Sequence, residues 1–318
     1  MLIPFLLLIL GLALLIKGAD WLVDSASVLA RKYKVSDLAI GLTIVAFGTS
    51  APELVVNTIA SFQDHQDIIF GNIIGSNNFN LFFILGAAGL ISPLVVQSNT
   101  VWKEIPMSLF AALLLYVLCN DFFAGTRFVL SRIDGILLLC FFGAFMFYIY
   151  RQLRTDAATT ALELSDMPNW KIIGLIIVGL TGLVIGGNLV MANAIKIATS
   201  LGMSEKIIGL TIVAAGTSLP ELATSIIAAI KRNNDIAVGN IIGSNIFNIF
   251  FILAVSATIR PVTYDIIFNT DLCLLMGGTL FLFIAMFTGR KKKLDRWEAG
   301  LLFLLYTGYT IYLVVKES

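Results

Sequence analysis

Two glutamates lie inside long apolar stretches, where a charged side chain is costly. Glu53 ends residues 41–53 (GLTIVAFGTSAPE), and Glu221 ends residues 209–221 (GLTIVAAGTSLPE), which are identical at 11 of 13 positions. Placing a carboxylate in hydrocarbon costs roughly 2.5 to 3.5 kcal/mol on insertion scales. A structural polar network between helices does not explain why the chain has a buried glutamate at two equivalent positions, 168 residues apart. We therefore interpret the two acids as an ion site.

Each glutamate follows a Gly-Thr-Ser sequence and a proline, which together interrupt a helix. Pro52 has no N–H to donate to the carbonyl of Gly48, and its ring disturbs that turn. The freed carbonyls need a partner that lipid cannot supply. Ala46, Thr49 and Glu53 lie at positions i, i+3 and i+7, so their polar atoms gather on one helix face. A cation suits this group of oxygens.

A second duplicated motif offers further oxygen atoms. The sequences GNIIGSNNFNLFFIL and GNIIGSNIFNIFFIL match at 13 of 15 positions, again 168 residues apart. In the first, Ser76 and Asn80 are four residues apart, so their hydroxyl and amide share a helix face. Ser244 and Asn248 repeat this arrangement in the second. Each central asparagine follows its glutamate by 27 residues, and we expect two hairpins of the same design to face each other.

The other small and polar residues of this motif are expected to serve helix packing. Glycines four apart let a neighbouring backbone come close, as in Gly71 with Gly75 and Gly239 with Gly243. The remaining asparagines could be ligands or could form hydrogen bonds between helices. We favour the second interpretation for all four: Asn72, Asn77, Asn240 and Asn245.

The composition indicates a helical membrane protein. Of 318 residues, 58% are hydrophobic and 13% are charged, and the mean hydropathy is +0.93. Soluble domains carry roughly 25% charged residues. Each membrane-spanning helix needs about 20 apolar residues. Ten runs are long enough: 2–30, 36–62, 69–92, 101–119, 128–150, 169–199, 204–230, 236–259, 266–288 and 297–316.

The repeat divides the chain into two five-helix halves, residues 1–151 and 169–318, joined by a polar linker at 152–168. Because five is odd, the second half inserts upside down relative to the first. That is the plan of secondary transporters with broken helices and binding at the midplane. The predicted fold is an all-α integral membrane protein of ten transmembrane helices, arranged as two inverted repeats.

The charged loops predict which way the chain crosses the membrane. Loops on the side of the linker hold 14 Lys and Arg residues, and those on the other side hold about six. By the positive-inside rule the linker is cytoplasmic and both termini are extracellular. The chain shows no targeting signal, so the plasma membrane of a prokaryote is the expected location.

Other function classes find little support. A net charge of +1 argues against nucleic-acid binding, which needs concentrated basic faces. The three cysteines have no CxxC spacing. An intramembrane hydrolase could use two acids, but the only histidine, His65, lies in a predicted loop. A cation channel remains an alternative, although a pore would not need a duplicated, inverted site.

With both motifs present twice at matched spacing, the chain resembles the cation/calcium exchanger superfamily, and closely the prokaryotic sodium/calcium exchangers. The resemblance covers essentially the whole chain. It implies a secondary active transporter, not an enzyme, that exchanges sodium for calcium by alternating access, commonly three for one, without a cofactor. It also implies that the first and sixth helices move as a gating unit against the other eight.

The resemblance also implies a ligand set. Its central carboxylates fall on Glu53 and Glu221, and its central amides on Asn80 and Asn248. The flanking sodium ligands are the carbonyls of Ala46 and Ala214 and the hydroxyls of Thr49, Thr217, Ser50, Ser218, Ser76 and Ser244.

One departure bears on the driving ion. Some relatives carry an aspartate where this chain has Asn248, and the potassium-dependent branch uses an acid there. We therefore expect exchange that does not need potassium. Proton/calcium exchangers show a Gly-Asn-x-x-Glu pattern in place of Gly-Thr-Ser-x-Pro-Glu, which weakens a proton/calcium antiporter as the alternative without excluding it.

Overall fold

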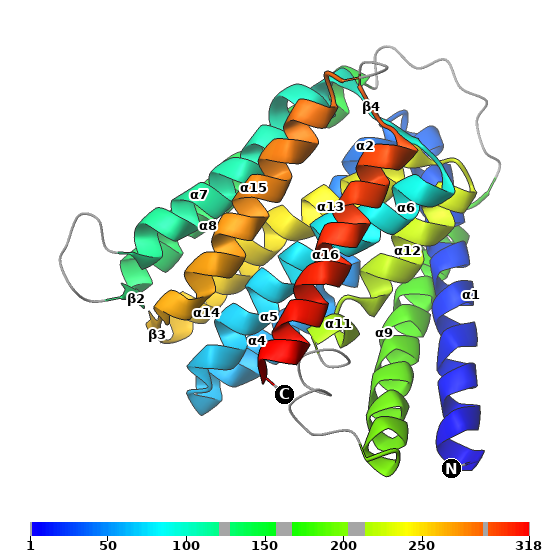
Figure 1. Cartoon of the computed structure of the whole chain (residues 1–318). Coiled ribbons are helices and arrows are strands. Elements are labelled where there is room, and N and C mark those ends of the chain that lie inside the picture. The colour runs from blue at the N-terminus through cyan, green and yellow to red at the C-terminus, as the bar shows by residue number, and fades with distance from the viewer. Residues whose placement is uncertain (1, 121–127, 157–166, 203–213, 289–291, 318) are drawn as a thin grey trace.

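The computed structural model describes residues 2–120, 128–156, 167–202, 214–288 and 292–317, and their elements are almost all helical (Figure 1). Those up to residue 156 are α1 (Leu2–Tyr33), α2 (Asp37–Ile40), η1 (Gly41–Val45), α3 (Ala46–Thr49), α4 (Ala51–Gln63), α5 (Gln66–Asn78), η2 (Phe79–Ile84), α6 (Leu85–Ile91), β1 (Leu94–Val95), η3 (Thr100–Glu104), α7 (Ile105–Cys119), β2 (Val129–Leu130) and α8 (Arg132–Asp156).

The elements after residue 167 largely repeat this order. They are α9 (Asn169–Ser200), α11 (Ala214–Gly216), α12 (Leu219–Ile230), α13 (Asn234–Phe247), η5 (Asn248–Leu253), α14 (Ala254–Ile259), β3 (Val262–Thr263), η6 (Ile266–Phe268), α15 (Asn269–Ala285), β4 (Lys293–Leu294) and α16 (Arg296–Glu317). Two short antiparallel strand pairs, β1 with β4 and β2 with β3, connect loops of the two halves.

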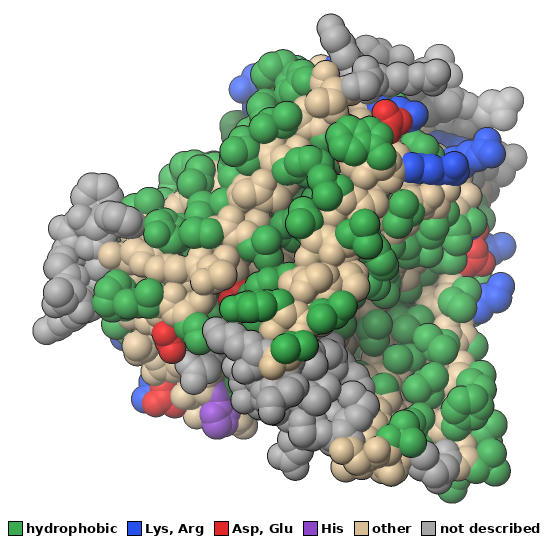
Figure 2. Space-filling view, in the orientation of Figure 1, with side chains coloured by type: hydrophobic (Ala, Val, Ile, Leu, Met, Phe, Trp, Pro, Cys, Tyr) green, Lys and Arg blue, Asp and Glu red, His purple; other side chains and the backbone are tan. Residues whose placement is uncertain are grey.

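Among the described residues, seven helical runs are long and apolar enough to cross a membrane, and the bent pair Asp37–Thr49 with Ala51–Gln63 makes eight. Figure 2 shows hydrophobic side chains over most of the face viewed, with charged ones mainly at its margins. The two other expected spans are 204–230 and 297–316. The first begins outside the described residues and the second coincides with α16. The fold is a helical membrane fold, and the count of ten spans stays a prediction.

The expected helix break is present in both halves. α3 ends at Thr49 and α4 begins at Ala51, and the two parts of the bent helix differ in direction by 46°. Ser50 between them has ψ of 8°, far from the helical value, and Ser218 before α12 has ψ of 9°. Because each proline follows within two residues, the break is a local consequence of the missing N–H.

Four π-helical segments, η1, η2, η3 and η5, were not expected, and two of them contain the central asparagines. η2 begins one residue before Asn80, and η5 begins at Asn248, so both central asparagines lie in wide helical turns. A π-helical turn holds an extra residue and is frequent at functional sites. The wide turn changes the direction in which the asparagine side chains leave their helices.

The glycines of the second duplicated motif behave as expected where the described residues allow a test. A Cβ at Gly239 would lie 3.0 Å from the carbonyl oxygen of Leu38, and one at Gly243 would lie 3.0 Å from that of Leu42. Thus α13 packs directly on the backbone of α2 and η1. At Gly75 no described atom lies within 4 Å, and the repeat counterparts of α2 and η1 fall outside the described residues.

The two longest helices, α1 and α9, lie side by side at one edge of the molecule (Figure 1). Glycines bring their backbones together: a Cβ at Gly18 would lie 2.7 Å from the carbonyl oxygen of Gly179, and one at Gly186 would lie 2.8 Å from that of Gly11. Small residues allow this approach in membranes, where van der Waals packing holds helices together.

Valine at Gly18 or Gly186 is therefore expected to destabilise the protein, by about 1–3 kcal/mol as for other overpacked contacts. Thermal unfolding of the purified protein in detergent measures the loss. Gly174→Val, on α9 with no described atom within 4 Å of the new Cβ, is the matched control. Equal unfolding temperatures for the three variants would contradict the close α1–α9 packing.

Candidate functional site

The two glutamates occupy equivalent places at the start of two helices. Glu53 lies in the first turn of α4 and Glu221 in the first turn of α12, each directly after the break. Unpaired N–H groups and the helix dipole favour a negative charge at this position. Both side chains are buried, with 1% of their surface exposed. The break therefore places each carboxylate at a helix end inside the protein.

Serines of the breaks connect the two halves. The Ser50 hydroxyl donates a hydrogen bond to Oε1 of Glu221 over 2.8 Å. The Ser218 hydroxyl donates to Oε1 of Glu53 over 3.2 Å. Each glutamate is thus held by the serine that precedes the other glutamate. The two breaks form one site at the contact between the halves.

Serines of the second motif add a contact within each half. The Ser76 hydroxyl donates to Oε1 of Glu53 over 3.5 Å, and the Ser244 hydroxyl donates to Oε1 of Glu221 over 3.4 Å. All of these contacts use the same carboxylate oxygen. The second oxygen of each glutamate, Oε2, is buried and has no hydrogen-bond partner.

Each central asparagine, like each glutamate, has one side-chain atom in a hydrogen bond and one without a partner. The Asn80 amide nitrogen donates to Oδ1 of Asn245 over 3.2 Å, and that of Asn248 donates to Oδ1 of Asn77 over 2.9 Å. Oδ1 of Asn80 and Oδ1 of Asn248 are buried without a partner. The bound nitrogen fixes each amide, and its oxygen stays available as a ligand.

The remaining asparagines of the motif form hydrogen bonds between helices. Asn77 and Asn245 donate to each other's backbone carbonyls over 3.2 and 3.3 Å. Oδ1 of Asn240 accepts a bond of 3.0 Å from the Thr49 hydroxyl, and Oδ1 of Asn72 accepts one of 3.0 Å from Thr217. The two threonine hydroxyls donate their hydrogens in these bonds, so their oxygen lone pairs can still face a cation.

Of the two expected carbonyl ligands, Ala46 lies among described neighbours and Ala214 lies at the edge of the described residues. The Ala46 carbonyl accepts the Ser50 N–H over 3.0 Å and lies 3.3 Å from the Thr49 hydroxyl, within the break. Ala214 is the first residue of α11, and the residues before it lie outside the described part of the chain.

Two residues near the glutamates were missed by the sequence reasoning. The Asn57 amide donates to the carbonyl of Glu53 over 2.8 Å, and its repeat counterpart Ser225 accepts a bond of 3.0 Å from Asn240. Both lie four residues after a glutamate in an apolar helix, which is a signal that could have identified them. They support the helices that carry the acids.

The central acids and amides leave four buried oxygens without a hydrogen-bond partner, two from each half: Oε2 of Glu53, Oε2 of Glu221, Oδ1 of Asn80 and Oδ1 of Asn248. An unsatisfied buried polar atom costs roughly 1–3 kcal/mol. Oxygens of carboxylates and amides are the ligands that hard cations such as calcium prefer. Among the described residues, no group of three His, Cys, Asp or Glu side chains could hold a metal ion.

Comparisons with known proteins agree with this chemistry. The family model described as sodium/calcium exchanger protein matches residues 3–151 and 171–315. The sequence is 33% identical to the sodium/calcium exchanger MaX1 of Methanosarcina acetivorans, over 98% of both chains. It is 39% identical to the inner membrane protein YrbG of Escherichia coli, over 83% of this chain and 82% of that protein. The structure of the sodium-calcium exchanger NCX_Mj, soaked with zero Na⁺ and Ca²⁺, matches with a TM-score of 0.83 and 34% identity, over 96% of this chain and 98% of that one.

Proposed function

The chain belongs to the sodium/calcium exchanger family, and we propose that it exchanges sodium for calcium by alternating access across the plasma membrane of a prokaryote. The observation that carries the proposal is the set of four buried, unpartnered oxygens contributed equally by the two halves. Calcium takes six to eight oxygens at about 2.3 to 2.6 Å. These four, with nearby hydroxyls and water, supply such a shell.

The charge of the site explains why the two ion fluxes are coupled. With Glu53 and Glu221 ionised, the empty site carries two negative charges, which one calcium or two sodium ions neutralise. A bare pair of buried carboxylates lacks both hydration and a counterion, so it is costly. An empty site therefore changes its orientation with difficulty, and one ion has to leave as the other binds.

Sodium is proposed to use the same central oxygens together with the oxygens of the breaks. Those ligands are the carbonyls of Ala46 and Ala214 and the hydroxyls of Thr49, Thr217, Ser50, Ser218, Ser76 and Ser244. The symmetric hydrogen bonds between the halves support equivalent sodium positions on the two sides of the glutamates.

We also propose the finer architecture of ten spans in two inverted repeats, residues 1–151 and 169–318, with a cytoplasmic linker at 152–168. In it, α1 and α9 move together against the remaining helices. Their glycine-mediated contact and their place at the edge of the molecule support this motion (Figure 1).

Cysteines introduced at Lys292 and at Gln63, in a background without native cysteines, are expected to react from opposite faces of the membrane. The 14-to-6 distribution of basic residues places the first in the cytoplasm and the second outside. Impermeant thiol reagents on intact cells and on inverted vesicles make the measurement. Reaction of both positions from the same face would overturn the ten-span topology.

Sodium-driven calcium uptake into vesicles is expected to proceed unchanged when potassium is replaced by choline. The reason is that Asn80 and Asn248 are both uncharged, so the site lacks the additional acid of the potassium-dependent branch. Imposed sodium, potassium and proton gradients are compared in one preparation. Uptake driven by protons would favour the proton/calcium antiporter, and a leak independent of any gradient would favour a channel.

A further inference from the structure

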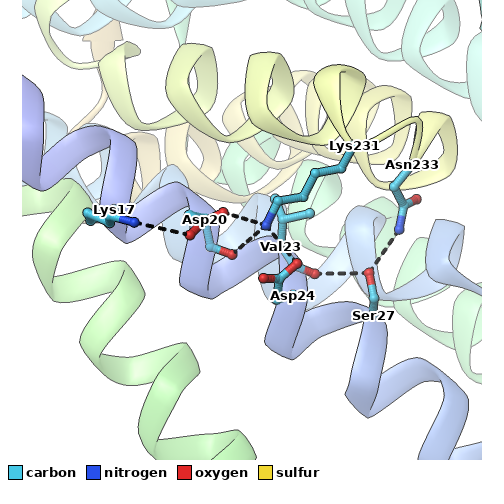
Figure 3. Close-up of polar contacts among 7 residues, drawn as sticks. All are labelled: Lys17, Asp20, Val23, Asp24, Ser27, Lys231 and Asn233. Atoms are coloured by element: carbon cyan, nitrogen blue, oxygen red, sulfur yellow. Dashed lines mark hydrogen bonds and ion pairs between the residues drawn. The ribbon is translucent and has the colours of Figure 1, made fainter.

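The site is symmetric, but the turns that follow its two glutamate helices, α12 and α4, make different contacts. Lys231, directly after α12, places its Nζ 2.6 Å from Oδ1 of Asp20 and 2.6 Å from Oδ1 of Asp24, both on α1 (Figure 3). The same Nζ donates to the Asp20 carbonyl over 3.2 Å. Lys17 lies 3.7 Å from the other oxygen of Asp20, on the same helix. One lysine of the turn after α12 is thus bound to two acids of α1.

A second residue of the same turn extends the contact along α1. The Asn233 amide donates to the Ser27 hydroxyl over 2.9 Å (Figure 3). It also donates to Oδ2 of Asp37 over 2.9 Å. Asp20, Asp24 and Ser27 are spaced i, i+4 and i+7, so they share one face of α1. The turn between α12 and α13 is therefore fastened over two turns of α1. α12 carries Glu221, so this contact joins α1 to the hairpin of the site.

The repeat has no counterpart of this contact at the other end of the molecule. Subtracting the offset of 168 from Lys231 and Asn233 gives Gln63 and His65. Adding it to the three residues of α1 gives Asn188, Ala192 and Ile195 on α9. These side chains cannot form an ammonium–carboxylate bridge. The bridge is therefore specific to one end of a duplicated structure.

The cavities near the site also differ in whether expected ligands line them. A cavity of about 440 Å³ is lined by Asn72 and Thr217, and one of about 200 Å³ by Ala51 and Thr217, so both reach the break that precedes Glu221. A cavity of about 630 Å³ lies at the Lys231 end, and none of its described lining residues is an expected ligand. The cavities that reach the breaks are thus distinct from the cavity at the Lys231 end.

Lys231 keeps its charge in this setting. Partial burial lowers its pKa, but hydrogen bonds to Asp20 and Asp24 outweigh that effect and raise the pKa of Lys231 above its ordinary value. The ammonium group of Lys231 therefore stays charged up to and above the ordinary lysine range.

We infer that Lys231 is a positioning residue for ion exchange: its bridge to Asp20 and Asp24 holds α1 against the Glu221 hairpin, favours the state closed at this end, and must break when the site opens here. The inference builds on the proposed exchange function. Because the ion pairs are partly exposed, we expect each to shift the balance of the two orientations only a few-fold. A shift of orientation changes apparent affinity in opposite directions on the two faces.

The test measures the apparent dissociation constant for calcium in sodium-driven exchange. It is measured from each face of the membrane, in right-side-out and in inverted vesicles. Lys231→Gln is expected to lower this constant a few-fold on the Lys231 face and to raise it on the opposite face. A merely structural defect would weaken binding on both faces. Lys17→Gln removes a lysine beside Asp20 without touching the α12–α13 turn, and it serves as the control.

A charge reversal provides rescue. Lys231→Asp and Asp24→Lys should each shift the constants as Lys231→Gln does, and the double variant should restore them. Unchanged constants in Lys231→Gln, or changes in the same direction on both faces, would overturn the inference while wild-type exchange stands.

A wild-type protein without exchange would overturn the proposed function instead. A measurement that needs no transport then tests whether the bridge holds the hairpin. Hydrogen exchange of the amides of residues 219–236 in purified protein should be faster in Lys231→Gln than in Lys17→Gln. Equal rates would show that the bridge does not hold this hairpin.

Discussion

Replacing Glu53 or Glu221 by glutamine is expected to abolish sodium-driven calcium exchange while leaving the protein folded. Glutamine keeps the size of the side chain but removes one of the two negative charges that balance calcium. Losing one partner of a buried charge pair costs about 3–5 kcal/mol, which corresponds to a loss of calcium affinity on the order of 10²- to 10³-fold or more. Because the hydrogen bonds of the two carboxylates mirror each other, both variants should be affected alike.

Calcium flux in vesicles and calcium binding to the purified variants measure this effect. Glu104→Gln is the matched control, because Glu104 is also a buried glutamate, on η3 and hydrogen-bonded to Tyr148, away from the site. Size-exclusion profiles and thermal unfolding establish that the variants are folded. Flux like that of the wild type in either Glu53→Gln or Glu221→Gln would remove that acid from the site.

Acidification is expected to weaken calcium binding by direct competition. In the proposed mechanism, protons and calcium bind the same carboxylate oxygens of Glu53 and Glu221, so each opposes the other by linkage. The apparent calcium dissociation constant should rise as the pH falls, by up to about tenfold per pH unit for each proton that calcium displaces. Saturating calcium should largely relieve the inhibition, since it displaces the protons.

Calcium binding and exchange titrated at several pH values between about 5 and 8 test this competition. The control is Lys17→Gln, whose altered group lies on α1 outside the site. Its slope of apparent affinity against pH should match that of the wild type. If affinity stays constant while only the maximal rate falls, protons act on the motion of the helices and the competitive mechanism is wrong.

Hydrogen bonds at the centre limit which parts of the protein can move during exchange. Ser50 and Ser218 bind the glutamates of the opposite halves, so separating the halves there would break contacts in both directions. The α1–α9 pair makes no such contact with the carboxylates among the hydrogen bonds of the described residues. A motion of this pair can therefore change access to the site while the ligands stay together.

The sequence alone determined the local features of the site. Pro52 and Pro220 lack an N–H, so each removes one helical hydrogen bond at its break. The duplicated motifs also predicted the central acids and amides, because equal spacing within helices places their side chains equivalently, and their role as ligands stays a prediction. Asn77 and Asn245 form hydrogen bonds between helices, as the favoured interpretation of the sequence predicted.

Only the tertiary structure decided which atoms of these residues are free and which helices hold them. Whether Ser50 turns to Glu221 or to its own glutamate depends on how two distant breaks meet. The π-helical turns at Asn80 and Asn248 likewise were not apparent in the repeat. The bridge from Lys231 to Asp20 joins residues 211 positions apart. Helix periodicity fixes side-chain directions only within one element, so contacts between elements follow from their packing, which no local pattern contains.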